Sequence, residues 1–85
     1  MYCVYLIRSK INPEKRYIGF TANLGQRLEE HNSGKSFHTA DFRPWYLVAY
    51  FSFDSKLKAL NFEKYLKSGA GNAFAHKRFC KLLQL

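Results

Sequence analysis

The chain has 85 residues, with 14 Lys and Arg against six Asp and Glu, which gives a formal net charge of +8. Its hydrophobic fraction of 47%, with eight Phe and six Tyr, can build a core without a disulfide or a structural metal. This composition excludes a disordered chain and favours one domain over residues 1–85. The positive charge indicates a polyanionic partner, with nucleic acid first. Charge that serves only solubility, or a ribosomal or membrane-surface association, is the alternative.

Neither end of the sequence suggests export or metal binding. Cys3 and Cys80 lie far apart and fit no zinc-ligand spacing, so we expect both to be reduced core residues. The apolar start ends at Arg8, which is too short for a signal peptide or a membrane span. We therefore expect a cytoplasmic protein with no membrane contact.

The first half of the chain predicts a hairpin followed by a basic helix. Residues 2–8 and 16–20 are rich in β-formers and flank a polar turn, which sets Tyr5 and Tyr17 on neighbouring strands. Asn23 is a natural N-cap for a helix over residues 24–32, and Gly34 is typical of its C-terminal end. In that helix Arg27 and His31 are four residues apart on one face, which we expect to be free for chemistry.

The second half predicts a strand and two helices. The polar, basic stretch 33–44 is expected to be a flexible loop that faces the substrate. Residues 45–53 form an almost unbroken apolar run, which predicts a strand buried on both faces, in the middle or the covered part of the sheet. A helix capped by Asp54 or Ser55 should run to about Lys67, and after a break at 68–71 a last helix should cover about 72–83. The expected fold is α+β, a small three-stranded antiparallel sheet flanked by helices in the order β-β-α-β-α-α.

Short motifs on these elements resemble a known family. Cys3-Val4-Tyr5 lies on the first strand, Tyr17-Ile18-Gly19 on the second, and Arg27 on the helix. This arrangement resembles the GIY-YIG endonuclease superfamily, in its small single-domain branch, and is similar to the nuclease domains found in excinuclease and in structure-specific endonuclease subunits. The resemblance extends through Phe62-Glu63-Lys64-Tyr65 and covers nearly the whole chain.

The resemblance implies a catalytic site. It places Tyr5, Tyr17 and Arg27 beside Glu63, and it makes Glu63 the ligand of a single divalent ion, Mg²⁺ or Mn²⁺. Phosphodiester hydrolysis needs a proton acceptor for water and a cation for the phosphate, which the tyrosines and the arginine fork can supply. His31 could orient water or accept a proton near neutral pH.

Each of these residues also has a structural interpretation. Arg27 could pair with Glu30, and Glu63 with Lys67 four residues on, both of which are common surface pairs. His31 could be a structural histidine. Cys3 departs from the glycine of the first motif, and Asn72 cannot be aligned with the family's accessory asparagine, so its role stays open.

A basic surface is expected to bind the nucleic acid backbone, and it comprises Lys10, Lys15, Arg16, Lys35, Arg43, Lys64, Lys67, Lys77 and Arg78. Phe37 and His38 lie among these cations and could stack on unpaired bases, whereas Trp45 begins an apolar strand and is expected in the core.

These observations predict a small metal-dependent endonuclease that acts on nucleic acid, with DNA the expected substrate, in repair or processing. The family's larger members carry separate recognition domains, so a protein partner that supplies substrate specificity is expected. A non-catalytic nucleic-acid-binding module, or a subunit of a repair complex, is the alternative.

Overall fold

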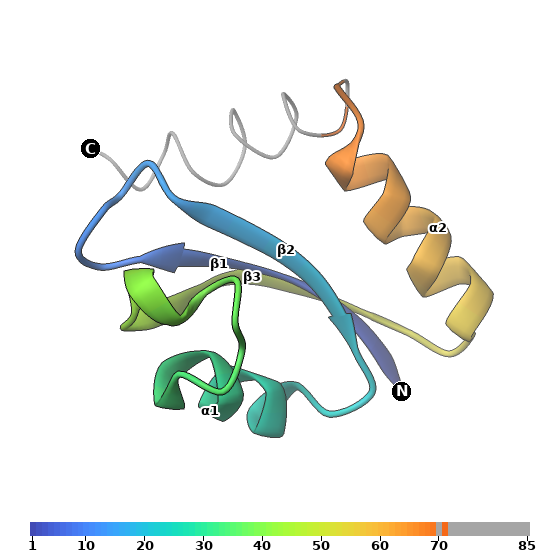
Figure 1. The fold of residues 1–85 in the computed structure, drawn as a ribbon. Helices are drawn as coiled ribbons and strands as arrows, with labels where there is room; N and C mark the ends of the chain where they lie inside the picture. The colour runs from blue at the N-terminus through green and yellow to red at the C-terminus, as the bar shows by residue number, and fades with distance from the viewer. Residues whose placement is uncertain (70, 72–85) are drawn as a thin grey trace.

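A computed structural model describes residues 1–69 and 71 of the chain (Figure 1). Its elements are strand β1 (Tyr2–Ser9), strand β2 (Arg16–Thr21), helix α1 (Leu24–Ser33), the short 3-10 helix η1 (Ala40–Phe42), strand β3 (Trp45–Phe53) and helix α2 (Lys56–Lys67). The α+β class and the order of these elements confirm the prediction. The expected last helix, with Cys80, lies outside the described residues. No helix in the described part of the chain is long and apolar enough to cross a membrane.

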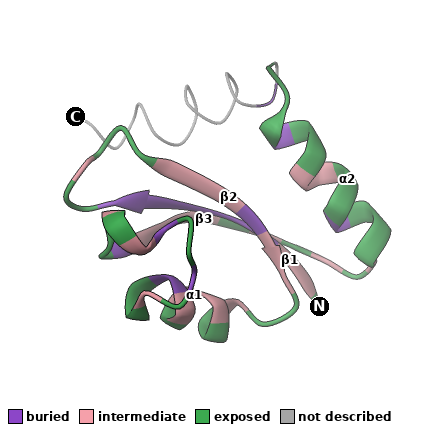
Figure 2. Ribbon diagram, viewed as in Figure 1, coloured by how far each residue is buried: buried purple, intermediate pink, exposed green. Residues whose placement is uncertain are grey.

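The three strands form an antiparallel sheet in the order β2-β1-β3. β1 is the central strand, and Val4 to Ser9 are all buried (Figure 2). β3 is at an edge, and of its residues only Trp45 is buried while Tyr50 is 56% exposed. The expectation of a strand buried on both faces was therefore wrong, and of the two places expected for it, the middle or the covered part of the sheet, the strand order excludes the middle.

A β-bulge explains the unbroken apolar run of β3. The register between β1 and β3 shifts between Leu6 and Ile7, because Leu6 pairs with Ala49 while Ile7 pairs with Leu47. Such an extra residue changes which face the following side chains take. Leu47 therefore packs with one core cluster and Phe51 with the other.

The two helices cover opposite faces of the sheet. One cluster contains Val4 from β1 with Ala59 and Leu66 from α2. The other contains Tyr5 and Ile7 from β1 with Trp45, and Leu24 and Leu28 of α1 pack against it. Trp45 is thus in the core, as expected, whereas Cys3 is only partly buried and does not belong to either buried cluster.

Capping residues define the helix ends. The Asn23 side chain accepts a hydrogen bond from the backbone N–H of Gln26 at 3.1 Å, and Gly34 ends α1 with φ of +86°, the left-handed region that favours glycine. Ser55 caps α2 by accepting from the N–H of Lys58. The loop after α1 is more closely held than expected, because Ser36 and Thr39 are buried within it.

Candidate active site

The two motif tyrosines lie diagonally across the β1–β2 ladder. Tyr5 pairs with Gly19 and Tyr17 pairs with Ile7, which leaves the tyrosine rings 6.2 Å apart between centroids. Gly19 makes the room for Tyr5. A Cβ at that position would overlap the Tyr5 hydroxyl and lie 2.5 Å from its Cζ and 2.8 Å from Cε1 of Tyr17. The glycine of the second motif is therefore required by close packing against both rings.

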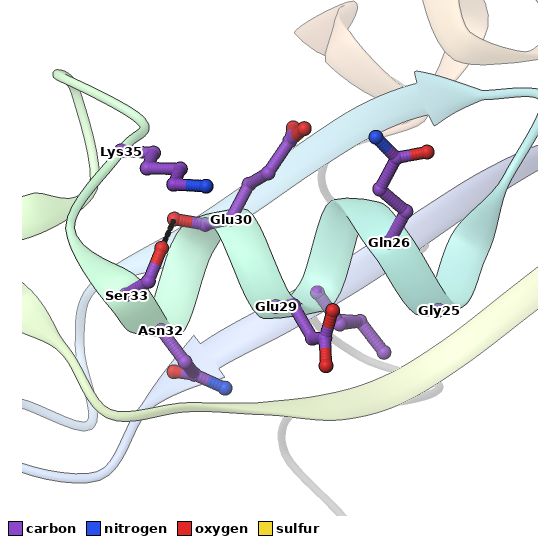
Figure 3. Close-up of a pocket in the computed structure, with 8 residues that line it drawn as sticks. Gly25, Gln26, Glu29, Glu30, Asn32, Ser33 and Lys35 are labelled. Carbon is purple, nitrogen blue, oxygen red and sulfur yellow. Dashed lines mark hydrogen bonds between the residues drawn. The ribbon is translucent and has the colours of Figure 1, made fainter.

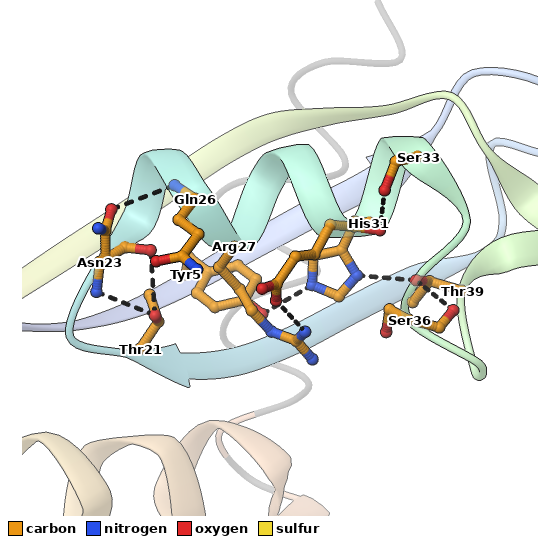
Figure 4. A network of polar contacts seen from close by, with 10 residues as sticks. Tyr5, Thr21, Asn23, Gln26, Arg27, His31, Ser33, Ser36 and Thr39 are labelled. Atoms are coloured by element: carbon orange, nitrogen blue, oxygen red, sulfur yellow. Dashed lines mark hydrogen bonds and ion pairs between the residues drawn. The ribbon is translucent and has the colours of Figure 1, made fainter.

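His31 connects α1 to both tyrosines, and its contact with Tyr5 is drawn in Figure 4. Its side chain is fully buried, with Nε2 at 2.8 Å from the Tyr5 hydroxyl and Nδ1 at 2.7 Å from Thr39 Oγ1. The imidazole also meets Tyr17 edge-on, with 4.9 Å between ring centroids. His31 thus contacts both tyrosines from the interior of the protein, in a place that bulk water does not reach. The face of α1 that carries it is packed, although it was expected to be free.

The hydrogen bonds favour one direction of the protons in this chain of contacts. The Thr39 hydroxyl donates its one proton to the carbonyl oxygen of Ser36 at 3.4 Å, so it accepts from Nδ1–H of His31. The other nitrogen, Nε2, of the neutral ring then accepts from the Tyr5 hydroxyl. Tyr5 consequently points its proton inward and keeps its oxygen lone pairs on the opposite side.

Burial controls the protonation of this pair. It raises the pKa of Tyr5 to about 12, with a further contribution from Tyr17, against a lowering by Arg27. Burial, with the charge of Arg27, also lowers the pKa of His31 to about 4. Both side chains are therefore neutral at pH 7.

Arg27 lies on α1 between the tyrosines and an acidic neighbour. Its Nη1 is 2.9 Å from Glu30 Oε1, so the pairing that was the structural alternative is present. Hydrogen bonding to Glu30 raises the pKa of Arg27, and hydrogen bonds with Tyr5 and Tyr17 act in the same direction. With 29% of the side chain exposed, the guanidinium keeps donors toward the tyrosines as well as an accessible side.

Glu63, the predicted metal ligand, comes from α2. Its Oε2 is 3.2 Å from Nζ of Lys67, which is the other structural alternative, and its side chain is only 20% exposed. The negative charge of Glu63 contributes to the raised pKa of Tyr5. The fold therefore brings Glu63 within electrostatic reach of a residue that lies 58 positions earlier in the chain.

Sequence comparison gives the relationship of this arrangement to known proteins. The GIY-YIG catalytic domain family matches residues 1–75. The chain belongs to the GIY-YIG family.

The chain is similar to endonuclease subunits of several fungi. The chain is 42% identical over 69 residues to the structure-specific endonuclease subunit SLX1 of Scheffersomyces stipitis, covering 73% of this chain and 20% of that protein. It is 41% identical to the SLX1 subunit of Debaryomyces hansenii, covering 78% of this chain and 21% of that protein. The chain thus spans about a fifth of the length of these relatives.

A solved structure shares the fold over most of both chains. The solution NMR structure of the UPF0213 protein BH0048 from Bacillus halodurans superposes with a TM-score of 0.53 at 30% identity, over 91% of this chain and 84% of that one. This similarity confirms the GIY-YIG fold that the motifs predicted.

GIY-YIG nucleases generally depend on a divalent metal, and the donor set here fits one ion held by a single carboxylate. Among residues 1–69 and 71, no group of three or more His, Cys, Asp or Glu converges as a ready cage. A hard ion such as Mg²⁺ retains several waters and needs only one or two carboxylates. Glu63 already holds a cation, the ammonium of Lys67, in a partly exposed pair of the kind worth only about 0 to 1 kcal/mol. Replacement of that ammonium by a metal ion would therefore cost little free energy.

Two surface hollows lie near these residues. The larger, of about 610 Å³, runs along the outer side of α1 and is lined by polar side chains such as Gln26, Glu29 and Asn32 (Figure 3). It shares only Glu30 with the site. The smaller, of about 390 Å³, is bordered by Tyr17 on β2 and Lys67 on α2. Tyr17 is the motif tyrosine that borders the smaller hollow, whereas Tyr5 is fully buried.

The predicted basic residues divide into groups in the structure. Lys15, Arg16 and Lys67 border the smaller hollow, and Lys64 is exposed on the same helix as Lys67. Lys10 is exposed just after β1, while Lys35 and Arg43 are exposed at the two ends of the loop that carries η1. Lys77, Arg78 and Asn72 lie outside the described residues.

Thr39 is a site residue that the sequence did not reveal. It lies eight positions after His31 in a polar loop, and no helical or strand spacing connects the two. Only the folding of that loop onto α1 places its hydroxyl against the imidazole.

Proposed function

We propose that this chain is an endonuclease that hydrolyses phosphodiester bonds in DNA with the help of one divalent ion. The observation that carries the proposal is the position of Tyr17. It is the more accessible of the two motif tyrosines, and it opens into the hollow bordered by Lys15, Arg16 and Lys67. The carboxylate of Glu14 also borders this hollow, so three cations against one carboxylate leave it a net positive charge that would attract the phosphates of a nucleic acid strand beside Tyr17.

The residues divide the work of hydrolysis. Water attacks the phosphorus, loses a proton, and the departing sugar oxygen gains one. Tyr17 is the group placed to contact the attacking water, since Tyr5 is fully buried. Arg27 donates its fork to the phosphate oxygens, where charge accumulates in the transition state. The partly exposed guanidinium can do so while it keeps its contacts with the tyrosines.

Tyr5 and His31 position this machinery. Because Tyr5 donates to His31, its oxygen is left as an acceptor toward Arg27. A neutral His31 avoids repulsion with the guanidinium, which its low pKa ensures. His31 is therefore proposed to act through Tyr5 and Tyr17, in place of the direct contact with water that the sequence suggested.

Glu63 is the residue that would hold the ion, which supplies positive charge at the phosphate. DNA is proposed as the substrate, and a protein partner as the source of specificity, because the fungal relatives are named subunits of structure-specific endonucleases. Processing or repair of DNA in the cytoplasm is the corresponding cellular role.

The test compares wild type with Tyr17→Phe and Glu63→Gln on labelled duplex, single-stranded and branched DNA and on RNA. Each substrate is incubated with Mg²⁺, with Mn²⁺ and with chelator. We expect metal-dependent cleavage by wild type only. Glu29→Gln is the matched control, because it removes an exposed carboxylate from the outer side of α1 and should leave cleavage unchanged.

Retained cleavage in Glu63→Gln would remove the single-carboxylate ion site from the mechanism. Binding by wild type and Glu63→Gln without cleavage by either would instead support a non-catalytic binding module.

A further inference from the structure

The loop between α1 and η1 presents an aromatic pair that is not part of the core. Phe37 is 89% exposed and His38 is exposed beside it, with their rings edge-to-face and 5.6 Å between centroids. A single exposed Phe is common on protein surfaces. This one differs because the residues on either side of the pair are buried.

Both neighbours of the pair are anchored. Ser36 and Thr39 are 8% and 1% exposed, and the Thr39 N–H donates to the Ser36 carbonyl at 3.2 Å. The Thr39 carbonyl accepts from Nε1 of Trp45 at 2.8 Å. Phe37 and His38 therefore form the tip of a short turn whose base is fixed, so binding a ligand there would order little additional chain.

The same base connects the pair to the tyrosines. Thr39 holds Nδ1 of His31, and His31 holds the hydroxyl of Tyr5 (Figure 4). Thr39, the residue that directly follows the aromatic pair, is thus connected to the Tyr5 hydroxyl by two hydrogen bonds through His31. Its position relative to the site is set by buried contacts.

The surroundings of the pair are cationic. Lys35 precedes it and is exposed, and the guanidinium of Arg43 lies against Gly34 at the start of the loop. Asp41 is the acidic residue of the loop, so the segment carries a net positive charge within a chain of +8. An exposed aromatic face on a loop that also carries cations is the combination that binds a nucleobase and its phosphates.

Bases in a duplex already stack on their neighbours and offer no free face. We propose that Phe37 and His38 stack on an unpaired base next to the cleaved bond, and that the substrate is therefore DNA with a single-stranded arm or gap. This inference rests on the proposed nuclease function, whose substrate class it specifies.

The test measures binding in chelator, so that cleavage does not enter. Fluorescence anisotropy gives the Kd of wild type, Phe37→Ala and Phe37→Trp for a single strand, a duplex of the same sequence and a flapped duplex. Leu57→Ala is the matched control, since Leu57 is 68% exposed on α2, on the opposite face of the sheet. 2-Aminopurine in the unpaired arm reports stacking directly.

We expect Phe37→Ala to weaken binding of the single strand and the flap by about 5- to 150-fold, the range that one stacked base provides. Duplex binding should not change, Phe37→Trp should restore affinity, and Leu57→Ala should have no effect. The melting temperature of Phe37→Ala should equal that of wild type, because the ring is exposed.

An equal loss of affinity for duplex and single strand, or no loss for either, would overturn the inference. If Phe37→Ala lost affinity for neither DNA, the exposed Phe37 would instead be assigned to a contact with a protein. Cleavage with Mg²⁺ or Mn²⁺ is assayed in parallel. If wild type cleaves nothing yet shows the Phe37-dependent preference, the nuclease proposal fails while the stacking surface stands. If wild type cleaves and Phe37→Ala binds every substrate normally, only the stacking surface fails.

Discussion

Acidification should destabilise this protein through His31. The folded-state pKa of His31 is about 4, whereas an unfolded histidine titrates near 6.5. Below pH 6.5 the His31 imidazole binds a proton in the unfolded chain but stays neutral in the folded chain, so the free energy of unfolding falls as the pH is lowered. The contribution of neutral His31 to the free energy of unfolding is complete above pH 6.5 and is lost progressively down to pH 4. Between pH 7.5 and 4.5 the free energy of unfolding should drop by about 2.5 kcal/mol from this one group.

The assay is urea unfolding at several pH values, followed by the fluorescence of Trp45, the only tryptophan of the chain and a buried one. His31→Gln supplies the comparison, because all carboxylates and the other histidines titrate in both proteins. His31→Gln should be less stable at neutral pH but should lose about 2.5 kcal/mol less than wild type on acidification. His38→Gln removes an exposed histidine and should retain the pH dependence of wild type.

A fall in stability that is the same for wild type and His31→Gln would refute the reasoning. It would mean that the imidazole is not a neutral buried group held between Tyr5 and Thr39.

Three further outcomes are expected. Gly19→Ala should cost about 1–3 kcal/mol in urea unfolding, because the added methyl overlaps the Tyr5 hydroxyl; an unchanged midpoint would contradict the close packing. Arg27→Lys should lower single-turnover cleavage on the order of 100-fold with little change in melting temperature, since an ammonium lacks the fork; near-normal cleavage would exclude a bidentate role. Lys67→Met should tighten Mn²⁺ binding at Glu63 by up to about fivefold in calorimetry, because the competing ion pair is gone; weaker binding would argue against Glu63 as the ligand.

The local features of the fold were predictable from the sequence. The hairpin, the Asn23 cap and the left-handed Gly34 depend on residues within a few positions of one another. The same holds for the ion pairs of Arg27 with Glu30 and of Glu63 with Lys67, which helix spacing alone allows. In each case the energy that selects the conformation comes from neighbouring residues, so a sequence pattern contains it.

The family motifs extended this reach to the candidate site. They named Tyr5, Tyr17, Arg27 and Glu63 together, although Glu63 lies on another helix and no spacing connects it to the tyrosines. The structure brings its charge close enough to act on Tyr5.

Tertiary structure alone decided the sheet order, the β-bulge and the burial of His31. An apolar run such as 45–53 is compatible with a central strand, and only its pairing with β1 showed that each half packs on a different face. His31 at a helical position near Arg27 is compatible with an exposed catalytic group. Its burial depends on Thr39 and the loop closing over it, contacts between segments whose separation in sequence carries no periodic signal. Local interactions therefore fixed the elements, and contacts between distant segments determined which side chains face the substrate and which support them.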